Sequence, residues 1–129
     1  MKSAVVTGAT GFIGSHLVAE LLTHNIEVWA VCRPNSPNLD RLPKDFRVHI
    51  VSCSIDSYER LSALLEGTEA DVFYHTAWEG ASGPGRSNEL LQCKNAEYAI
   101  RAVQAAASIH CSKFIATGTV YEEFYPQII

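Results

Sequence analysis

The chain opens with Lys2-Ser-Ala-Val-Val-Thr-Gly-Ala-Thr-Gly-Phe-Ile-Gly-Ser-His16, and this stretch decides the fold. A short apolar run, Ala4 to Val6, leads into three glycines spaced three apart. Apolar residues then recur at helical spacing, at Ile13, Leu17, Val18, Leu21 and Leu22. The pattern predicts a strand, a glycine turn and a helix laid end to end.

Such a turn points free backbone N–H groups at one spot, where the helix dipole adds partial positive charge. A pyrophosphate fits there. We expect Gly8 to let the chain turn sharply, Gly11 to leave room for the phosphates, and Gly14 to let the helix pack closely on the strand.

The spacing G-x-x-G-x-x-G within Thr7-Gly-Ala-Thr-Gly-Phe-Ile-Gly14 resembles the extended short-chain dehydrogenase/reductase family. That family includes the NAD-dependent epimerases and dehydratases of nucleotide sugars and the dihydroflavonol-reductase-like enzymes. The resemblance implies a Rossmann-like, doubly wound α/β fold: a parallel sheet of five strands in order 3-2-1-4-5, truncated after the fifth strand. It also implies that residues 1–129 form an NAD(P)-binding domain, in which Thr10, Phe12 and Ile13 join the glycines in binding the cofactor.

The bulk composition limits the possible function classes. A chain of 129 residues can form one domain that buries about two thirds of its unfolded surface. Its residues are 47% hydrophobic and 19% charged, and no apolar run approaches the roughly 20 residues of a membrane span. The N-terminus has no signal-peptide layout, so we expect a cytoplasmic protein. A net charge of −4 gives no reason to expect nucleic acid binding.

The four cysteines are widely scattered and include no C-x-x-C pair: Cys32, Cys53, Cys93 and Cys111. We therefore expect reduced thiols, with neither a disulfide framework nor a metal site.

Ile26 to Val31 predicts a second strand, whose end bears on the choice of nucleotide. Folds that select NAD place an Asp or Glu near this position to hold the ribose 2′-OH, but the strand here leads into Cys32-Arg33-Pro34. A guanidinium at Arg33 would pair instead with a 2′-phosphate, and Arg-Pro-Asn-Ser36 resembles the same segment of NADP-using relatives. NADP is therefore expected in preference to NAD; a solvated loop arginine is the alternative.

Arg47 to Ser52 predicts the third strand. We expect Asp56 to be the N-cap of a short helix that ends at Gly67, with an apolar stripe of Leu61, Leu64 and Leu65. In the family, an Asp followed by an apolar residue contacts adenine after this strand. The matching pair is Ser54-Ile55, so the resemblance assigns adenine contact to these two residues without the carboxylate.

Asp71 to Ala77 predicts the fourth strand and is similar to a family motif that closes in His-x-Ala-Ala. The resemblance implies that Thr76, Ala77 and Trp78 line the ribose and nicotinamide side of the cofactor. His75 is expected to be a hydrogen-bonded structural residue rather than an acid or base.

An irregular loop over residues 79–87 follows, in which Arg86 could meet an anionic substrate. A long helix is predicted from Asn88 to about His110, with apolar faces that include Leu91, Ala99, Ile100, Val103 and Ala106. By resemblance, Asn95 anchors the loop around the active site and counts among the cofactor-binding residues.

Lys113 to Thr119 predicts the fifth strand. Thr117 and Thr119 match hydroxyl positions of the family, which implies cofactor contact for Thr117 and a catalytic role for Thr119 as donor to the substrate oxygen. The family's Tyr-x-x-x-Lys pair, whose lysine lowers the tyrosine pKa, is absent from these 129 residues.

Two functions remain open at this point. One is an NAD(P)-dependent epimerase, dehydratase or carbonyl reductase domain that acts on a small molecule such as a nucleotide sugar. The other is a non-catalytic dinucleotide-binding module. A homo-oligomer is expected, because an open sheet edge recruits strands and dimers of the family commonly use the long helix.

Overall fold

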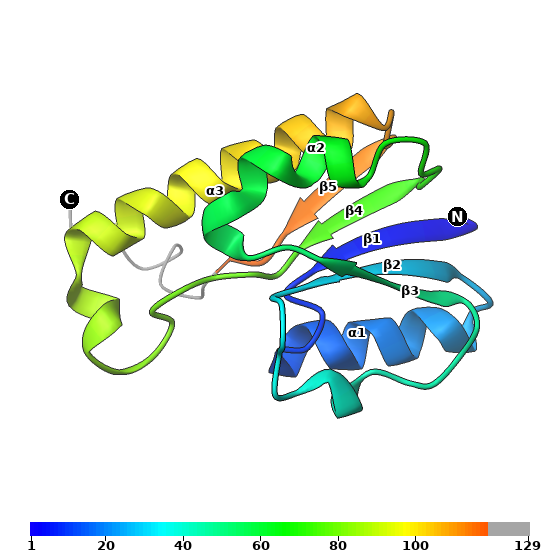
Figure 1. Ribbon diagram of the computed structural model, residues 1–129, viewed down its shortest axis with the longest axis horizontal. Helices are drawn as coiled ribbons and strands as arrows, with labels where there is room; N and C mark the ends of the chain where they lie inside the picture. Colours follow the sequence, from blue (N-terminus) through cyan, green and yellow to red (C-terminus); the bar gives the residue numbers. More distant parts are fainter. Residues whose placement is uncertain (119–129) are drawn as a thin grey trace, which may run out of the picture.

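The computed structural model describes residues 1–118 as a parallel five-stranded sheet with helices on both faces (Figure 1). The strand order is β3-β2-β1-β4-β5, and each neighbouring pair is parallel. The predicted fold class and strand order are confirmed.

The elements alternate along the chain as the sequence pattern indicates. The strands are β1 (Ser3–Thr7), β2 (Glu27–Cys32), β3 (Val48–Ser52), β4 (Val72–His75) and β5 (Lys113–Ala116). The α-helices are α1 (Phe12–Thr23), α2 (Leu61–Leu64) and α3 (Glu89–Ser108), and 3-10 turns occupy η1 (Leu39–Arg41), η2 (Ile55–Arg60) and η3 (Gly83–Ser87). Strands β4 and β5 are shorter than predicted, so Thr76, Ala77 and Thr117 lie in loops.

Strand β1 lies at the centre of the sheet, and its side chains alternate between two cores. Val5 is fully buried on the face that α2 and α3 cover, whereas Ala4 and Val6 are fully buried on the face that α1 covers (Figure 1). Because both faces are buried, the middle of the strand is a continuous apolar run from Ala4 to Val6, as is typical of a parallel sheet. The first strand, and with it the glycine turn, is thus held from both sides.

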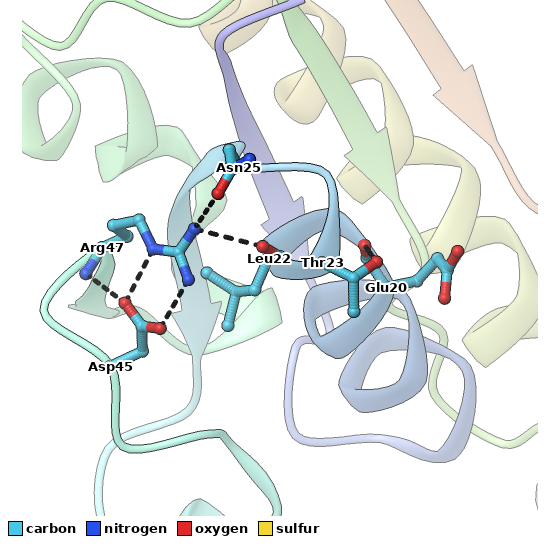
Figure 2. Close-up of polar contacts among 6 residues, drawn as sticks. All are labelled: Glu20, Leu22, Thr23, Asn25, Asp45 and Arg47. Carbon is cyan, nitrogen blue, oxygen red and sulfur yellow. Dashed lines mark hydrogen bonds and ion pairs between the residues drawn. The ribbon is translucent and has the colours of Figure 1, made fainter.

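Arg47, in the loop before β3, forms an ion pair with Asp45 of the same loop and hydrogen bonds to the C-terminal end of α1 (Figure 2). Arg47 Nη2 lies 2.7 Å from Asp45 Oδ2, and its Nη1 donates to the Leu22 carbonyl at 3.1 Å and to Asn25 Oδ1 at 3.2 Å. A helix C-terminus carries partial negative charge and unpaired carbonyls, so a guanidinium stabilises it. Asn25, two residues after the end of this helix, has φ of 58°.

The predicted helix cap at Asp56 is wrong. Ser54 is the N-cap residue of η2, and Asp56 lies inside this 3-10 turn. The helix itself is only four residues long and begins at Leu61. Of the expected apolar stripe, Leu61 and Leu65 are fully buried but Leu64 is 40% exposed. A 3-10 turn followed by a single α-helical turn does not keep the 3.6-residue period on which the stripe was based.

Helix α3 begins at the N-cap Asn88, whose side chain accepts a hydrogen bond from the Leu91 N–H. Its inner face buries Ala102, Ala105 and Ala106. Ile100 and Val103, expected on an apolar face, are 59% and 45% exposed, because the three alanines already fill the contact with the sheet. None of the helices within residues 1–118 is long and apolar enough to cross a membrane.

Candidate functional site

A cavity of about 410 Å³ lies at the carboxyl ends of four strands. Chain segments that follow β1, β2, β3 and β4 line it, and β1 and β4 are the neighbours between which the strand order reverses. Ligands of open α/β sheets bind at this switch point. The lining residues are Gly8, Thr10, Gly11, Val31, Cys32, Arg33, Asn38, Cys53, Ser54, Ile55, Asp56, Tyr58, Thr76, Ala77, Trp78 and Glu79.

Gly8 allows the loops after β1 and β4 to touch. Its φ is 65°, and a Cβ there would lie 2.8 Å from the Ala77 N atom and 2.9 Å from Thr76 Oγ1. A Cβ at Gly11 would meet only the Gly8 carbonyl, at 3.2 Å, and would otherwise project into open space. Substituting Gly8 would therefore push the cavity wall apart.

Gly14 lets α1 start close to the end of β1, since a Cβ at this position would overlap the Gly8 carbonyl. The N-cap residue Gly11 offers no side-chain acceptor to the first amides of the helix. The N-terminal amides of α1 are thus available beside the cavity that Gly8, Thr10 and Gly11 line. Phe12 and Ile13, predicted to bind the cofactor, have side chains that are 78% and 56% exposed and do not line the cavity, so any contact they make is through these amides.

Arg33 directly follows β2, is exposed, and lines the cavity together with Asn38. The lining also contains two carboxylates, Asp56 of η2 and Glu79 of the loop after β4. The guanidinium is thus placed where a ligand in the cavity can reach it.

The wall after β3 consists of the predicted pair Ser54-Ile55 together with the buried side chains of Cys53 and Tyr58. Burial raises the pKa of the thiols of Cys32 and Cys53 and of the Tyr58 hydroxyl. These groups therefore stay protonated near neutral pH, and this wall carries no negative charge except at Asp56.

The wall after β4 is tied to β1 through Thr76, whose Oγ1 donates to the Thr7 carbonyl at 2.7 Å. His75, one residue earlier, is 3% exposed, and its Nδ1 lies 2.8 Å from Thr7 Oγ1. Within the part of the chain that the structure describes, His75 Nε2 is buried without a hydrogen-bond partner. Burial lowers the His75 pKa to about 4, so the ring is neutral at neutral pH and fits the predicted structural role.

Two amides of α3 hold the loop between β4 and α3. Asn95, which is 1% exposed, accepts from the Glu79 N–H at 3.0 Å and donates Nδ2 to the Glu79 carbonyl at 2.7 Å. Gln92 accepts from Trp78 Nε1 at 2.9 Å and donates to the Gly85 carbonyl at 2.9 Å. Asn95 does not line the cavity and acts on it only through the loop.

The remaining predicted residues lie near the strand ends or beyond the described chain. Thr117 is exposed, and its N–H donates to the His75 carbonyl at 3.1 Å, which places it beside the end of β4. Thr119, the predicted catalytic residue, lies outside the described residues. Arg86 is exposed on η3 and does not line the cavity.

The prediction from sequence missed several residues that build the site: Ser36, Asn38, Arg41, Asp56 and Gln92. Ser36 and Arg41 bond to Thr10 across 26 and 31 residues of sequence, and no local pattern signals such contacts.

Among residues 1–118, no three His, Cys, Asp or Glu side chains gather in a way that could hold a metal ion.

Solved structures share this fold over most of the chain. An epimerase of Methanothermobacter thermautotrophicus matches 92% of the chain with a TM-score of 0.78 at 19% identity. UDP-glucose 4-epimerase of Thermotoga maritima, solved with UDP-glucose, matches 91% with a TM-score of 0.75 at 23% identity. The Bordetella bronchiseptica enzyme WbmH, solved with NAD+, matches 88% with a TM-score of 0.70 at 25% identity. The chain spans 35%, 38% and 38% of the lengths of these three proteins.

The sequence itself matches a protein family over nearly its full length. Residues 4–128 fit the NAD dependent epimerase/dehydratase family, a range that includes the glycine turn and, apart from Ser3, all five strands described above. The chain belongs to the NAD-dependent epimerase/dehydratase family.

Proposed function

We propose that residues 1–129 form the dinucleotide-binding domain of an epimerase/dehydratase-type oxidoreductase and that the cavity at the carboxyl ends of the strands holds the cofactor. One observation carries the proposal: the Gly8–Gly14 turn leaves the first amides of α1 open beside a cavity at the switch point of the sheet. Bound there, a nicotinamide dinucleotide would supply hydride transfer.

The residues of the chain fit each part of a dinucleotide. The amides of the first turn of α1 would bind the pyrophosphate, for which Gly11 leaves room, while Ser54 and Ile55 would contact the adenine. Thr76, Ala77 and Trp78 form the opposite wall, where the nicotinamide half would lie. Asn95 would orient that wall by fixing Glu79, and Thr117 would contact the cofactor from the end of β5.

NADP is the proposed cofactor rather than NAD, because Arg33 is the cationic side chain of the cavity wall after β2. Asp56, across the cavity, is a carboxylate that could instead favour the ribose hydroxyls of NAD. Among proteins of the same fold, WbmH was solved with NAD+ and a short-chain dehydrogenase/reductase of Veillonella parvula with NADP, so binding must be measured.

The test is a fluorescence titration of the chain with NADPH and NADH. NADPH should bind more tightly, and Arg33→Ala should weaken NADPH binding by about tenfold or more, because a hydrogen bond to a charged group contributes about 1.5–3 kcal/mol. Arg101→Ala, which removes an exposed arginine on α3, should change neither affinity. Equal affinities for the two nucleotides, unaltered by Arg33→Ala, would overturn the NADP assignment.

We propose a nucleotide sugar as the substrate of the whole enzyme, with Thr119 as donor to the reacting oxygen. The fold match to a UDP-glucose 4-epimerase supports this class; a carbonyl reductase of the dihydroflavonol-reductase type is the alternative substrate class. We expect that the 129-residue chain by itself does not turn over substrate above background, because it contains no Tyr-x-x-x-Lys pair. Turnover of a sugar nucleotide that Thr119→Ala abolishes would contradict this.

The second candidate function is a dinucleotide-binding module without catalysis. The two functions differ in what a longer chain contains. An in-frame Tyr-x-x-x-Lys within a few tens of residues after Ile129 would favour the enzyme. A stop codon directly after Ile129 would favour the module.

A further inference from the structure

Ser36 is a buried serine on the loop between β2 and η1, and the cavity does not explain its burial. Its exposed fraction is 6%, and it is not one of the lining residues. Its hydroxyl lies 3.1 Å from the hydroxyl of Thr10, which does line the cavity from the glycine turn. The Asn38 N–H donates to Ser36 Oγ at 3.3 Å from two residues on. These hydrogen bonds link Thr10, in the wall formed by the glycine turn, through Ser36 to Asn38, in the wall formed by the segment after β2.

Burial determines which of the two hydroxyls donates the hydrogen bond. Within residues 1–118, Ser36 Oγ has one acceptor for its proton, Thr10 Oγ1, so Ser36 donates to Thr10. A buried hydroxyl that keeps its proton unpaired loses the free energy of that hydrogen bond. Thr10 therefore accepts from Ser36, and its own proton remains to be donated. Thr10 is 8% exposed and is one of the residues that line the cavity.

The loop that carries Ser36 is stiff. Pro34 and Pro37 flank the short segment and fix two φ angles, while Asn35 between them has φ of 55°. Arg41 closes the arrangement from η1, since its Nη1 donates to the Thr10 carbonyl at 3.3 Å. Thr10 is thus held twice by the segment that follows β2, once at its hydroxyl and once at its backbone.

We propose that Ser36 and Arg41 are positioning residues that aim the Thr10 hydroxyl proton at a phosphate oxygen of the bound dinucleotide. A hydroxyl whose oxygen already accepts one hydrogen bond has fewer orientations left for its own proton before the ligand arrives. An anionic acceptor then makes a stronger hydrogen bond than a neutral one. Because Arg33 and Ser36 belong to one short loop, the segment at the end of β2 and the glycine turn contact the ligand as one unit. This inference rests on the proposed function, because it requires a dinucleotide in the cavity.

The test compares three variants of the chain: Thr10→Val, Ser36→Ala and the double variant. Dissociation constants for NADPH and NADH are measured by fluorescence titration. Thr10→Val removes the donor and should weaken binding by about tenfold, the effect expected for one hydrogen bond to a charged acceptor. Ser36→Ala leaves Thr10 in place but free to rotate, and should weaken binding by about threefold.

The double variant separates positioning from a general loss of structure. If Ser36 acts through Thr10, Ser36→Ala should cost no further affinity once Thr10 is Val. Thr10→Ser, which keeps the hydroxyl, should bind like the wild type and regain the sensitivity to Ser36→Ala. Ser112→Ala is the matched control, because this serine donates to the Asp71 carbonyl at 2.9 Å at the opposite end of the sheet.

The two nucleotides identify which phosphate accepts the proton. Equal losses for NADPH and NADH would assign it to the pyrophosphate, and a loss for NADPH alone would assign it to the 2′-phosphate. A threefold loss from Ser36→Ala that persists in the Thr10→Val background, or no loss at all, would overturn the positioning role while leaving the proposed function standing. A wild-type chain that binds neither nucleotide would overturn both.

Discussion

Thr7 Oγ1 and His75 Nδ1 lie 2.8 Å apart and join the ends of the two central strands, β1 and β4, beneath the candidate site. His75 Nε2 has no partner within residues 1–118. A buried unpaired N–H is costlier than a buried unpaired lone pair, so the neutral ring carries its proton on Nδ1 and donates to Thr7. Protonation of Nε2 as well would place a positively charged imidazolium in the core, so burial disfavours the charged form of His75.

Stability should therefore fall on acidification between pH 6.5 and 4. The pKa of His75 is lowered to about 4 by burial, below the ordinary value of 6.5, so the unfolded chain takes up the proton first. The contribution of neutral His75 is complete above pH 6.5 and is lost toward pH 4, with a slope of at most about 1.4 kcal/mol per pH unit. Urea unfolding at a series of pH values measures this slope. His75→Gln should remove it, and His16→Gln, at an exposed site, should not.

The contact of Gly8 with the loop after β4 can be separated from its backbone conformation by a matched pair of substitutions. Gly8 and Gly67 both have positive φ, at 65° and 79°, but a Cβ at Gly67 would have nothing within 4 Å. Each alanine variant should lose about 1–3 kcal/mol from strain, and Gly8→Ala should lose about 1–3 kcal/mol more because Ala77 must move. Equal losses in urea unfolding would show that the close approach to Ala77 has no cost.

Asn95 should control access to the loop between β4 and α3. Asn95→Ala removes two hydrogen bonds to the backbone of Glu79, and each lost bond should cost about 0.5–1.5 kcal/mol. The loop should open more often, and trypsin should cleave after Arg86, on the exposed turn η3, faster than in the wild type. Gln104→Ala, at an exposed position of α3, is the control. Unchanged cleavage would mean that Gln92 alone holds the loop.

The pair Asp45–Arg47 (Figure 2) gives a prediction for a single carboxyl group. Hydrogen bonds from the Arg47 side chain, and then from its backbone, lower the pKa of Asp45 to about 2. An NMR titration of the Asp45 carboxyl should give a midpoint near this value. In Arg47→Ala the midpoint should rise but stay below the ordinary 3.8, because the backbone hydrogen bond from residue 47 remains. The stabilisation from this pair is complete above pH 4 and is lost as the pH falls toward 2, below the range in which His75 acts.

Self-association should depend on the outer face of α3. Leu90, Ile100 and Val103 are 79%, 59% and 45% exposed there, and exposed apolar side chains of this kind mark contact surfaces. Sedimentation over a wide concentration range should show a concentration-dependent species, which Ile100→Glu should weaken and Gln104→Glu should not. A monomer at every concentration would contradict the homo-oligomer expected from the sequence.

The glycine turn and the strand order could be predicted from the sequence because both depend on local signals. The spacing of Gly8, Gly11 and Gly14 after an apolar run is visible within 15 residues, and alternating strands and helices leave few topologies. The cap at Asp56 was mispredicted because the outcome there depends on packing rather than on a local signal. The same acidic residue fits a helix cap or a 3-10 turn, and packing of Tyr58 and Leu61 in the core selects the turn.

The polar supports of the site could not be predicted from sequence. Ser36, Arg41 and Gln92 are ordinary surface residue types, and their contacts arise only when distant segments meet. Likewise, the helical spacing of Ile100 and Val103 is correct for an apolar face, but nothing local shows that alanines take the side facing the sheet.

The contact between the loops after β1 and β4 has a consequence for synthesis on the ribosome. Thr76 bonds to Thr7, and Ala77 packs on Gly8, across 69 residues of sequence. Until β4 has emerged and paired with β1, the glycine turn lacks the wall that completes the cavity. A nascent chain that presents only β1, α1 and β2 therefore has the phosphate-binding sequence without its shape. Cofactor capture should begin only after β4 leaves the exit tunnel, since contacts this distant in sequence form late.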